Sequence, residues 1–167
     1  FVVYGNAGVC KVDKVGSLEK MHMPKGKKYY TLVPVYSKGS KVFTPVDSDK
    51  VILRPVLSKE EATELVHEID DVEEMQIPDN KKREEIFKQS LRRCDCRELI
   101  RVMKTINTRR EERIAEGKKV TAGDEKMLHA AEENLSRELA VAFDLEKEVV
   151  VDFLKCKMKG LECEPIC

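Results

Sequence analysis

The chain has 167 residues, of which 37% are charged and only 5% aromatic, with no Trp. This length holds one or two compact domains, and this composition favours a protein with much exposed helix. No apolar run approaches the roughly 20 residues that cross a bilayer, so no membrane partner is expected. The chain is long enough to bury a core without the disulfide framework of a small secreted domain, so its six cysteines predict a reducing, cytoplasmic location.

The net charge of zero conceals an uneven distribution. Residues 1–57 hold ten Lys and Arg against four Asp and Glu, a net +6, whereas residues 58–78 hold one against eight, a net −7. Residues 79–119 hold fourteen against eight, a net +6, and residues 120–167 hold six against eleven, a net −5. Two basic blocks are the electrostatic footprint of a protein that contacts phosphates, although merely solvated helix faces would give the same counts.

Residues 1–57 have the sequence pattern of a small β-domain. Short Val-rich runs are separated by turn signals, of which SKGS at residues 37–40 is the strongest. Pro34 and Pro45 lack the N–H that a ladder bond needs, so we expect them at edge positions or bends. Four to five short strands with tight turns predict a small barrel of the SH3 or Tudor type.

From residue 58 onward the sequence predicts helices. Apolar residues recur every three or four positions, and short loops between the helices favour an antiparallel bundle. The predicted helix starts are Ser58 with Glu61 as a capping box, Asp79, Asp95 with Glu98 as a second box, and Thr121, before a break at Phe143-Asp144 and a last helix.

The predicted fold class is therefore α+β, with two domains. The first is an SH3/Tudor-like β-barrel over residues 1–57. The second is an all-α helical bundle over residues 58–159, which begins with an acidic helix and connection at 58–78. Residues 160–167 are expected to be a frayed tail.

The densest run of basic residues crosses the predicted second and third helices. Many of its members lie three or four positions apart, which gathers them on one helix face that could neutralise backbone phosphates. Interleaved Glu84, Glu85 and Glu98 leave open the alternative of a solvated, mixed face. The basic residues are Lys81, Lys82, Arg83, Lys88, Arg92, Arg93, Arg97 and Arg101.

The sequence offers no convincing catalytic or cofactor site. Cys94-Asp95-Cys96 could be half of a zinc site, but no second pair of ligands stands nearby, so no metal is expected. No motif for nucleophilic catalysis surrounds any cysteine, and no phosphate-binding glycine loop is present. We therefore expect no catalytic residue, no cofactor and no small-molecule substrate.

Several segments resemble a known family. VVYGNAGVCKV, YYTLVPVY, KVFTPVD and VILRPVLS resemble the polymerase-interacting module of the CarD/CdnL family of bacterial transcription regulators, a module also present in the transcription-repair coupling factor. VTAGDEKMLHAAEENLSRELAVA resembles a characteristic helix of that family's C-terminal domain. The likeness covers about residues 1–143, in the same order.

The resemblance implies a non-enzymatic regulator with two partners. Its N-terminal domain would dock on the β subunit of RNA polymerase, and its helical domain would contact promoter DNA at the upstream edge of the transcription bubble, stabilising the open complex. It would act in the bacterial cytoplasm, associated with the nucleoid. The implied polymerase-binding residues are Val42, Phe43, Thr44 and Leu18, and the implied DNA-binding residues are Asn80, Lys81, Lys82, Arg83 and Lys126.

This sequence departs from the family pattern at two places. Asn80 stands where the best-known members place a Trp wedge, which leaves weaker fork stabilisation, or a wedge from Ile77 or Met75, as alternatives. Polymerase-contacting arginines of some members match Leu18 and Phe43, which predicts a more apolar interface. A second hypothesis is a protein-interaction adaptor that uses the same β-module without binding DNA. A third, an enzyme that uses a cysteine, has almost no support.

Overall fold

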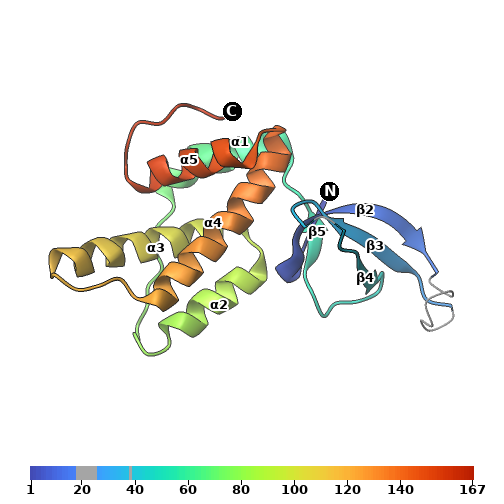
Figure 1. Ribbon diagram of the computed structural model, residues 1–167, viewed down its shortest axis with the longest axis horizontal. Helices are drawn as coiled ribbons and strands as arrows, with labels where there is room; N and C mark the ends of the chain where they lie inside the picture. Colours follow the sequence, from blue (N-terminus) through green and yellow to red (C-terminus); the bar gives the residue numbers. More distant parts are fainter. Residues whose placement is uncertain (18–25, 38) are drawn as a thin grey trace. The chain divides into compact units, whose positions relative to one another are not determined.

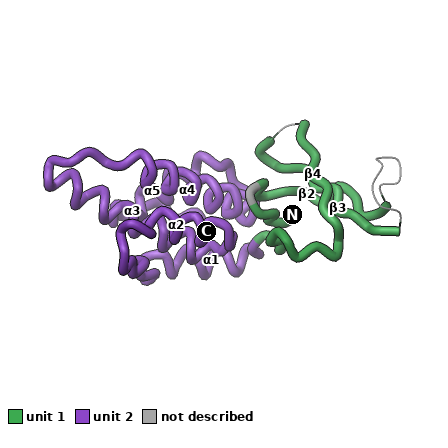
Figure 2. Tube along the Cα trace, turned by 90° about the horizontal axis from the view of Figure 1, so that it is seen from below, with its two compact units in different colours: residues 1–56 green, residues 57–167 purple. Residues whose placement is uncertain are grey.

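The computed structural model describes residues 1–17, 26–37 and 39–167. These residues form two compact units, residues 1–56 and residues 57–167, drawn in green and purple in Figure 2. The first unit contains the strands and the second the long helices, which confirms the predicted α+β class. Within the described ranges, none of the helices is both long enough and apolar enough to cross a bilayer.

Unit 1 is a curled antiparallel sheet that forms a half-barrel (Figure 1). In the described part of the chain the strand order is β4-β3-β2-β1-β5, so β4 and β5 are the edge strands. The predicted small β-domain is thus confirmed, in the form of a half-barrel. The strands are β1 (Val2–Tyr4), β2 (Gly8–Gly16), β3 (Tyr29–Pro34), β4 (Val42–Pro45) and β5 (Leu53–Pro55).

The turn between β1 and β2 depends on glycine. Gly5 begins a short 3-10 turn, Gly5–Ala7, with φ +38°, and a Cβ there would lie 2.4 Å from Cγ1 of Val51. The Gly5 N–H also donates to the Ile52 carbonyl oxygen at 2.9 Å. Since both contacts fix the turn against the segment before β5, a larger residue at position 5 would push the two apart.

Prolines and a small core complete the sheet. Pro34 is the last residue of β3, and Pro45 is the last residue of edge strand β4, so neither interrupts a ladder. Leu32 and Cys10 are fully buried, with Val3, Val9 and Tyr29 almost so. Because this core is small, we expect the sheet to have a low free energy of unfolding.

Unit 2, all of whose residues are described, consists of helices around one continuous apolar core. The helices are α1 (Lys59–Glu68), α2 (Arg83–Arg93), α3 (Cys96–Ala115), α4 (Ala122–Phe143) and α5 (Lys147–Met158), with a short 3-10 turn, Ile69–Asp71, after α1. The largest fully buried apolar side chains are Phe87, Ile69, Leu99, Ile100, Met103, Ile106, Leu135, Leu139 and Leu154.

Most predicted helix ends are where the sequence places them. The Glu61 N–H donates to Ser58 Oγ at 3.2 Å and the Ser58 N–H donates to Glu61 Oε2 at 2.8 Å, a complete capping box. Thr121 Oγ1 accepts from the N–H of Asp124 at the start of α4. Helix α4 ends at Phe143, because Asp144 adopts the left-handed conformation with φ +55°.

Two predicted caps differ in the structure. Asp95 does cap α3, but the Glu98 carboxylate does not return the bond; it accepts from Ser90 Oγ at 2.9 Å and from Arg101 at 3.0 Å. Asp79 does not cap α2, which begins at Arg83. Its carboxylate instead accepts from the Lys81 N–H at 2.9 Å, a local turn that competes with helix formation.

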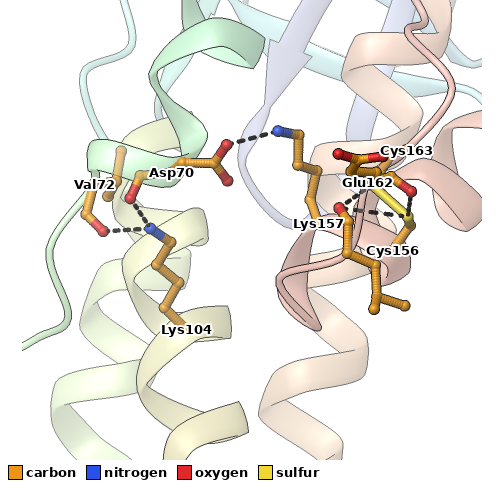
Figure 3. Close-up of polar contacts among 8 residues, drawn as sticks. Asp70, Val72, Lys104, Cys156, Lys157, Glu162 and Cys163 are labelled. Atoms are coloured by element: carbon orange, nitrogen blue, oxygen red, sulfur yellow. Dashed lines mark hydrogen bonds and ion pairs between the residues drawn. A yellow bond between two sulfur atoms is a disulfide. The ribbon is translucent and has the colours of Figure 1, made fainter.

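The connection from α1 to α2 is irregular but firmly held by the helices beside it (Figure 3). Lys104 Nζ donates to the carbonyl oxygens of Asp70 and Val72, both at 2.8 Å, and Lys157 pairs with the Asp70 carboxylate at 2.6 Å. Met75 and Ile77 pack against the helical core. These two side chains are therefore engaged within the protein, which argues against the expectation that either serves as a free wedge for DNA.

Candidate interaction surfaces

Strand β4 contains three of the four predicted polymerase contacts and lies at the edge of the sheet. Among the described residues it pairs only with β3, where Phe43 lies opposite Thr31 and Thr44 opposite Tyr30. Because side chains alternate along a strand, Val42 and Thr44 share one face and Phe43 lies on the other. A partner packed on one face could not reach all three side chains, whereas a strand paired with the edge would lie beside each of them.

The surroundings of β4 are apolar at two further points. Val46 follows the strand directly, is 41% exposed, and donates its N–H to the Lys28 carbonyl oxygen at 3.0 Å. Val15 on β2 is 50% exposed. Sequence reasoning missed Val46, although its position next to the predicted strand was a usable signal. Leu18, the fourth predicted contact, lies outside the described residues.

The predicted DNA contacts gather where the starts of α2 and α4 meet. Asn80, Lys81 and Lys82 are exposed in the turn before α2, and Lys126 is exposed near the start of α4. The pKa of the Glu84 carboxyl is lowered, first by a hydrogen bond and the charge of Lys88, and then by the charge of Lys126, which places Lys126 close to the first turn of α2.

Arg83, the fifth predicted contact, is engaged within the protein. Its Nε donates to Oδ1 of Asp124 at 3.0 Å, and the two side chains are only 17% and 7% exposed. Arg109 approaches the same carboxylate, with Nε 3.9 Å from Asp124 Oδ2, and its Nη1 donates to Asn80 Oδ1 at 3.0 Å. Arg83 therefore fixes α2 to α4 and has much of its charge compensated.

Sequence reasoning missed Arg109 and Asp124. Arg109 lies 29 positions after Asn80, and Asp124 lies 41 positions after Arg83. No local motif marks either residue, because the contacts exist only once three helix segments pack together.

Most of the predicted basic cluster is paired with carboxylates. Five of its eight residues form ion pairs, which are Arg83–Asp124, Lys88–Glu84, Arg92–Glu85, Arg97–Glu68 and Arg101–Glu98. Lys81, Lys82 and Arg93 have no ion pair with any described residue. The mixed-face alternative therefore applies to most of the cluster, while uncompensated positive charge concentrates at Lys81 and Lys82, with Lys126 nearby.

The internal cysteines are built into the packing. Cys96 is buried and its thiol donates to Oε2 of Glu138 at 3.2 Å, while the buried Cys94 thiol donates to the Leu91 and Arg92 carbonyl oxygens. Burial raises the pKa of the Cys10 thiol, the opposite of what activates a nucleophile. Within the described ranges, no three His, Cys, Asp or Glu side chains are grouped so as to hold a metal ion.

The tail contains a feature that the sequence did not predict. Cys156, at the end of α5, and Cys163 form a disulfide whose Cα atoms are 5.9 Å apart (Figure 3). Cys167 is exposed and its Sγ lies 4.0 Å from Nε2 of His67 on α1. The irregular spacing of these cysteines carried no pairing signal, because the bond depends on how the chain reverses after α5.

Comparison with known families identifies the first unit. The family described as CarD-like/TRCF RID domain matches residues 1–57. Residues 1–57 are therefore a CarD-like/TRCF RID domain, a non-catalytic interaction module, as the resemblance predicted. No curated protein matches the chain. The resemblance noted for residues 120–142 stays a prediction.

Proposed function

We propose that this chain, whose first 57 residues form a CarD-like/TRCF RID domain, is a transcription regulator that joins RNA polymerase to promoter DNA. Strand β4 binds the β subunit of the polymerase, and the turn before α2, together with the start of α4, binds DNA. The observation that carries the proposal is the match of residues 1–57 to a polymerase-interacting domain. This match supports RNA polymerase as a partner directly. The proposal that DNA is a second partner is supported by the charges of unit 2.

The polymerase contact uses strand addition. An edge strand offers a row of backbone N–H and C=O groups to an incoming strand, and its side chains on both faces then set specificity. Phe43 and Val42 are both partly exposed and apolar. Phe43 would contribute an apolar contact at a position that matches a polymerase-contacting arginine in some members of the resembled family, so this interface is less sensitive to salt.

The DNA contact uses the uncompensated cations of unit 2. Lys81, Lys82 and Lys126 are exposed and form no ion pair with described residues. Helix α2 also begins without a side-chain cap, and its dipole adds partial positive charge beside Lys82. Three neutralised phosphates correspond to a salt slope of about −2.7 in log affinity against log salt.

The effect on transcription follows from differential affinity. A factor that binds the open complex better than the closed one shifts the population by the ratio of the two affinities. Asn80 is polar, and Met75 and Ile77 are partly buried against the helical core. Stabilisation therefore comes from phosphate and groove contacts without an unstacking wedge, and we expect it to be weaker than that of a factor with a wedge.

The test measures two bindings with paired variants of the full chain. Lys81→Ala, Lys82→Ala and Lys126→Ala combined should abolish most DNA affinity and flatten its salt dependence, while binding to the isolated β-subunit lobe is unchanged. Lys59→Ala, Lys119→Ala and Lys159→Ala combined remove the same charge from other exposed positions and serve as the control. Phe43→Asp should weaken lobe binding, with Val149→Asp, at a 48% exposed apolar position of unit 2, as its control. Absence of lobe binding by the unmodified chain would refute the proposal.

The alternative function is a protein-interaction adaptor. It is favoured by one observation, the pairing of five of the eight cluster cations with carboxylates. An adaptor would bind the polymerase lobe but would show no DNA affinity even at low salt, where phosphate contacts are strongest. A titration of the unmodified chain with a promoter fragment at low salt separates the two functions.

A further inference from the structure

We propose that Arg109 is a positioning residue that fixes the orientation of Asn80 for contact with DNA. This inference rests on the proposed function. Arg109 belongs to the C-terminal half of α3 and its side chain is 24% exposed. It reaches across to the turn before α2 by the bond from Nη1 to Asn80 Oδ1, at 3.0 Å.

Two groups hold the Arg109 guanidinium in place. Asn80 Oδ1 accepts the one hydrogen bond, from Nη1, whereas the Asp124 carboxylate, which also binds Arg83, forms only an ion pair with Nε at 3.9 Å, too long for a hydrogen bond. Arg83 in turn approaches the Asn80 carbonyl oxygen with Nη1 at 3.5 Å. Asn80 is thus bound through both its side chain and its backbone, and the turn that contains Lys81 and Lys82 is fixed with it.

The direction of the Asn80 bond determines what the residue can offer a ligand. Its Oδ1 is occupied as an acceptor, so its amide NH2 group is the part left to donate. An NH2 donor suits a phosphate oxygen or the acceptor atoms that A·T and T·A pairs present in the minor groove. Asn80 would therefore act as a hydrogen-bond donor at the position where a wedge is missing.

A lysine cannot replace Arg109 in this arrangement. The planar guanidinium places Nη1 on the amide oxygen while its Nε edge faces the Asp124 carboxylate as an ion pair at 3.9 Å. Lysine keeps the charge but has a single ammonium group on a flexible stem. The conservative substitution Arg109→Lys therefore separates a role in geometry from a role in charge.

The test measures DNA affinity at several salt concentrations for Arg109→Ala, Arg109→Lys and Asn80→Ala. Each should lower affinity by roughly tenfold, the size of one charge-assisted hydrogen bond. The salt slope should not change, because none of these substitutions removes a cation that neutralises a phosphate. Lys82→Ala, in contrast, should reduce the slope by about one. The double variant Asn80→Ala with Arg109→Ala should lose no more DNA affinity than Asn80→Ala alone, since the two residues act through one hydrogen bond.

Two results would overturn the role of Arg109. A slope reduced by about one in Arg109→Ala would make it a direct phosphate contact. An unchanged affinity in Asn80→Ala, whose exposed position keeps the fold intact, would show that the bond is irrelevant to DNA. If the unmodified chain binds no DNA at low salt, it is the proposed function that fails, so the two failures are distinguishable.

A separate observation concerns the C-terminal tail. After α5 the chain reverses at Gly160, with φ +64°, and the Leu161 N–H donates to the Cys156 carbonyl oxygen at 3.3 Å. The Cys156–Cys163 disulfide closes this reversal (Figure 3). Cys163 itself and Ile166, which follows it, are partly buried and pack against the helical core. The tail is therefore folded back on unit 2 and fastened at one covalent point.

We infer that Cys156 and Cys163 are a reversible thiol–disulfide switch that fastens or releases residues 160–167. With glutathione disulfide as oxidant, one thiolate attacks it and expels one glutathione, forming a mixed disulfide. The second cysteine thiolate then displaces the other glutathione and forms the Cys156–Cys163 bond. Two protein thiols lose two protons and two electrons, and one glutathione disulfide becomes two glutathiones. Excess glutathione reverses both steps.

The surroundings make this pair the accessible one. Cys10, Cys94 and Cys96 are buried, whereas Cys156 and Cys163 are partly exposed. The bond closes a loop with a sequence separation of only 7, so its constraint acts on the tail, while the apolar core holds the helices. Reduction should therefore release the tail and uncover the region of α1 around His67, without unfolding unit 2.

The test equilibrates the full chain with defined glutathione ratios and measures hydrogen exchange of residues 160–167 and of α1. The oxidised chain should protect the tail, and the reduced chain and Cys156→Ser should expose it, with a nearly unchanged Tm. Cys167→Ser should keep the switch, because that cysteine is free. Equal tail protection in both redox states, or peptide mapping that pairs Cys163 with Cys167, would overturn the inference.

Discussion

The two units use charge in opposite ways. Unit 1 holds a net +6 over residues 1–57, yet the surface that we propose for polymerase binding is an edge strand with the apolar residues Val42 and Phe43. Unit 2 has a basic block of equal net charge at residues 79–119, but most of the cations in its densest run are bound by carboxylates. The comparison teaches that a count of cations does not measure free positive surface; the pairing in the fold does.

The units also differ in how much core supports each surface. Unit 1 spans 56 residues, near the lower limit for an independent domain, and few of its described residues are fully buried. The helical unit has a larger continuous core. The proposed polymerase surface should therefore be easier to destroy by a core mutation than the proposed DNA surface.

Leu32→Ala should have the largest effect. Leu32 is fully buried, and removing a buried leucine side chain costs about 2–5 kcal/mol of unfolding free energy, enough to unfold a small sheet. Binding to the polymerase lobe should disappear while helical circular dichroism and DNA binding persist. Val33→Ala, at a partly exposed neighbour, is the control. Loss of helix signal along with the sheet would show that the units do not fold separately.

Glu138→Ala should have the next largest effect, on unit 2. Glu138 is 2% exposed, and its carboxylate accepts from the Leu57 N–H at 3.1 Å and from the Cys96 thiol. Truncation leaves buried donors unsatisfied, which costs about 1–3 kcal/mol each. Denaturant unfolding followed by circular dichroism measures the loss, with exposed Glu148→Ala as the control. A loss of unfolding free energy no larger than that of Glu148→Ala would mean that water replaces the Glu138 carboxylate as the acceptor for these two donors.

Ser58→Ala sharpens the comparison at the first residues of unit 2. The substitution removes the Ser58 side-chain half of the capping box, and the cost should be about 1 kcal/mol of unfolding free energy. Asp95→Ala removes a cap without a reciprocal bond and should cost a similar amount. Ser58→Ala leaves the bond from the Ser58 backbone N–H to the Glu61 carboxylate in place. A much larger loss for Ser58→Ala, measured by thermal unfolding of each variant, would show that the two bonds of the box depend on each other.

The smallest expected effects come from two adjacent glutamates on α4. Burial raises the pKa of the Glu132 carboxyl. Burial also raises the pKa of Glu133, but the Lys147 hydrogen bond and the charges of Arg137 and Lys147 outweigh it, so that pKa is lowered. The folded state therefore holds a proton more tightly on Glu132 and less tightly on Glu133 than the unfolded state does.

These opposite shifts give opposite pH dependences. Stability from Glu133 is present above its unfolded pKa and is lost as pH falls through the lower folded pKa; for Glu132, stability falls as pH rises from the unfolded pKa to the higher folded one. At neutral pH, Glu132→Gln should stabilise and Glu133→Gln destabilise, each by about 0.5 kcal/mol. Both differences should vanish in acid, as unfolding curves at several pH values can show. If both substitutions stabilised the protein, or both destabilised it, at neutral pH, the opposite pKa shifts of Glu132 and Glu133 would be contradicted.

Local signals in the sequence predicted the elements well. The capping box at Ser58, the caps at Asp95 and Thr121 and the break at Asp144 depend on a few neighbouring residues, so each could be read from the sequence. The prediction that Asp79 caps α2 was wrong, because a short acidic side chain can form a local turn as readily as it can cap a helix.

Contacts between distant segments could not be predicted. The pairing of Arg97 with Glu68 and of Arg83 with Asp124 decides which cations stay free, and no sequence spacing announces either contact. The same holds for the bond from Arg109 to Asn80 and for the Cys156–Cys163 disulfide. The candidate DNA surface stays a prediction from the sequence, and which of its cations are left without an ion pair depends on packing.

The most direct test of the central claim is a two-partner binding measurement on one pair of variants. Each of Phe43→Asp and the combined Lys81→Ala, Lys82→Ala and Lys126→Ala variant is titrated with the polymerase β-subunit lobe and with a promoter fragment. The proposed function predicts that Phe43→Asp loses binding to the lobe and keeps binding to DNA, and that the triple lysine variant loses binding to DNA and keeps binding to the lobe. Loss of both partners by either variant, or of neither by both, would contradict it.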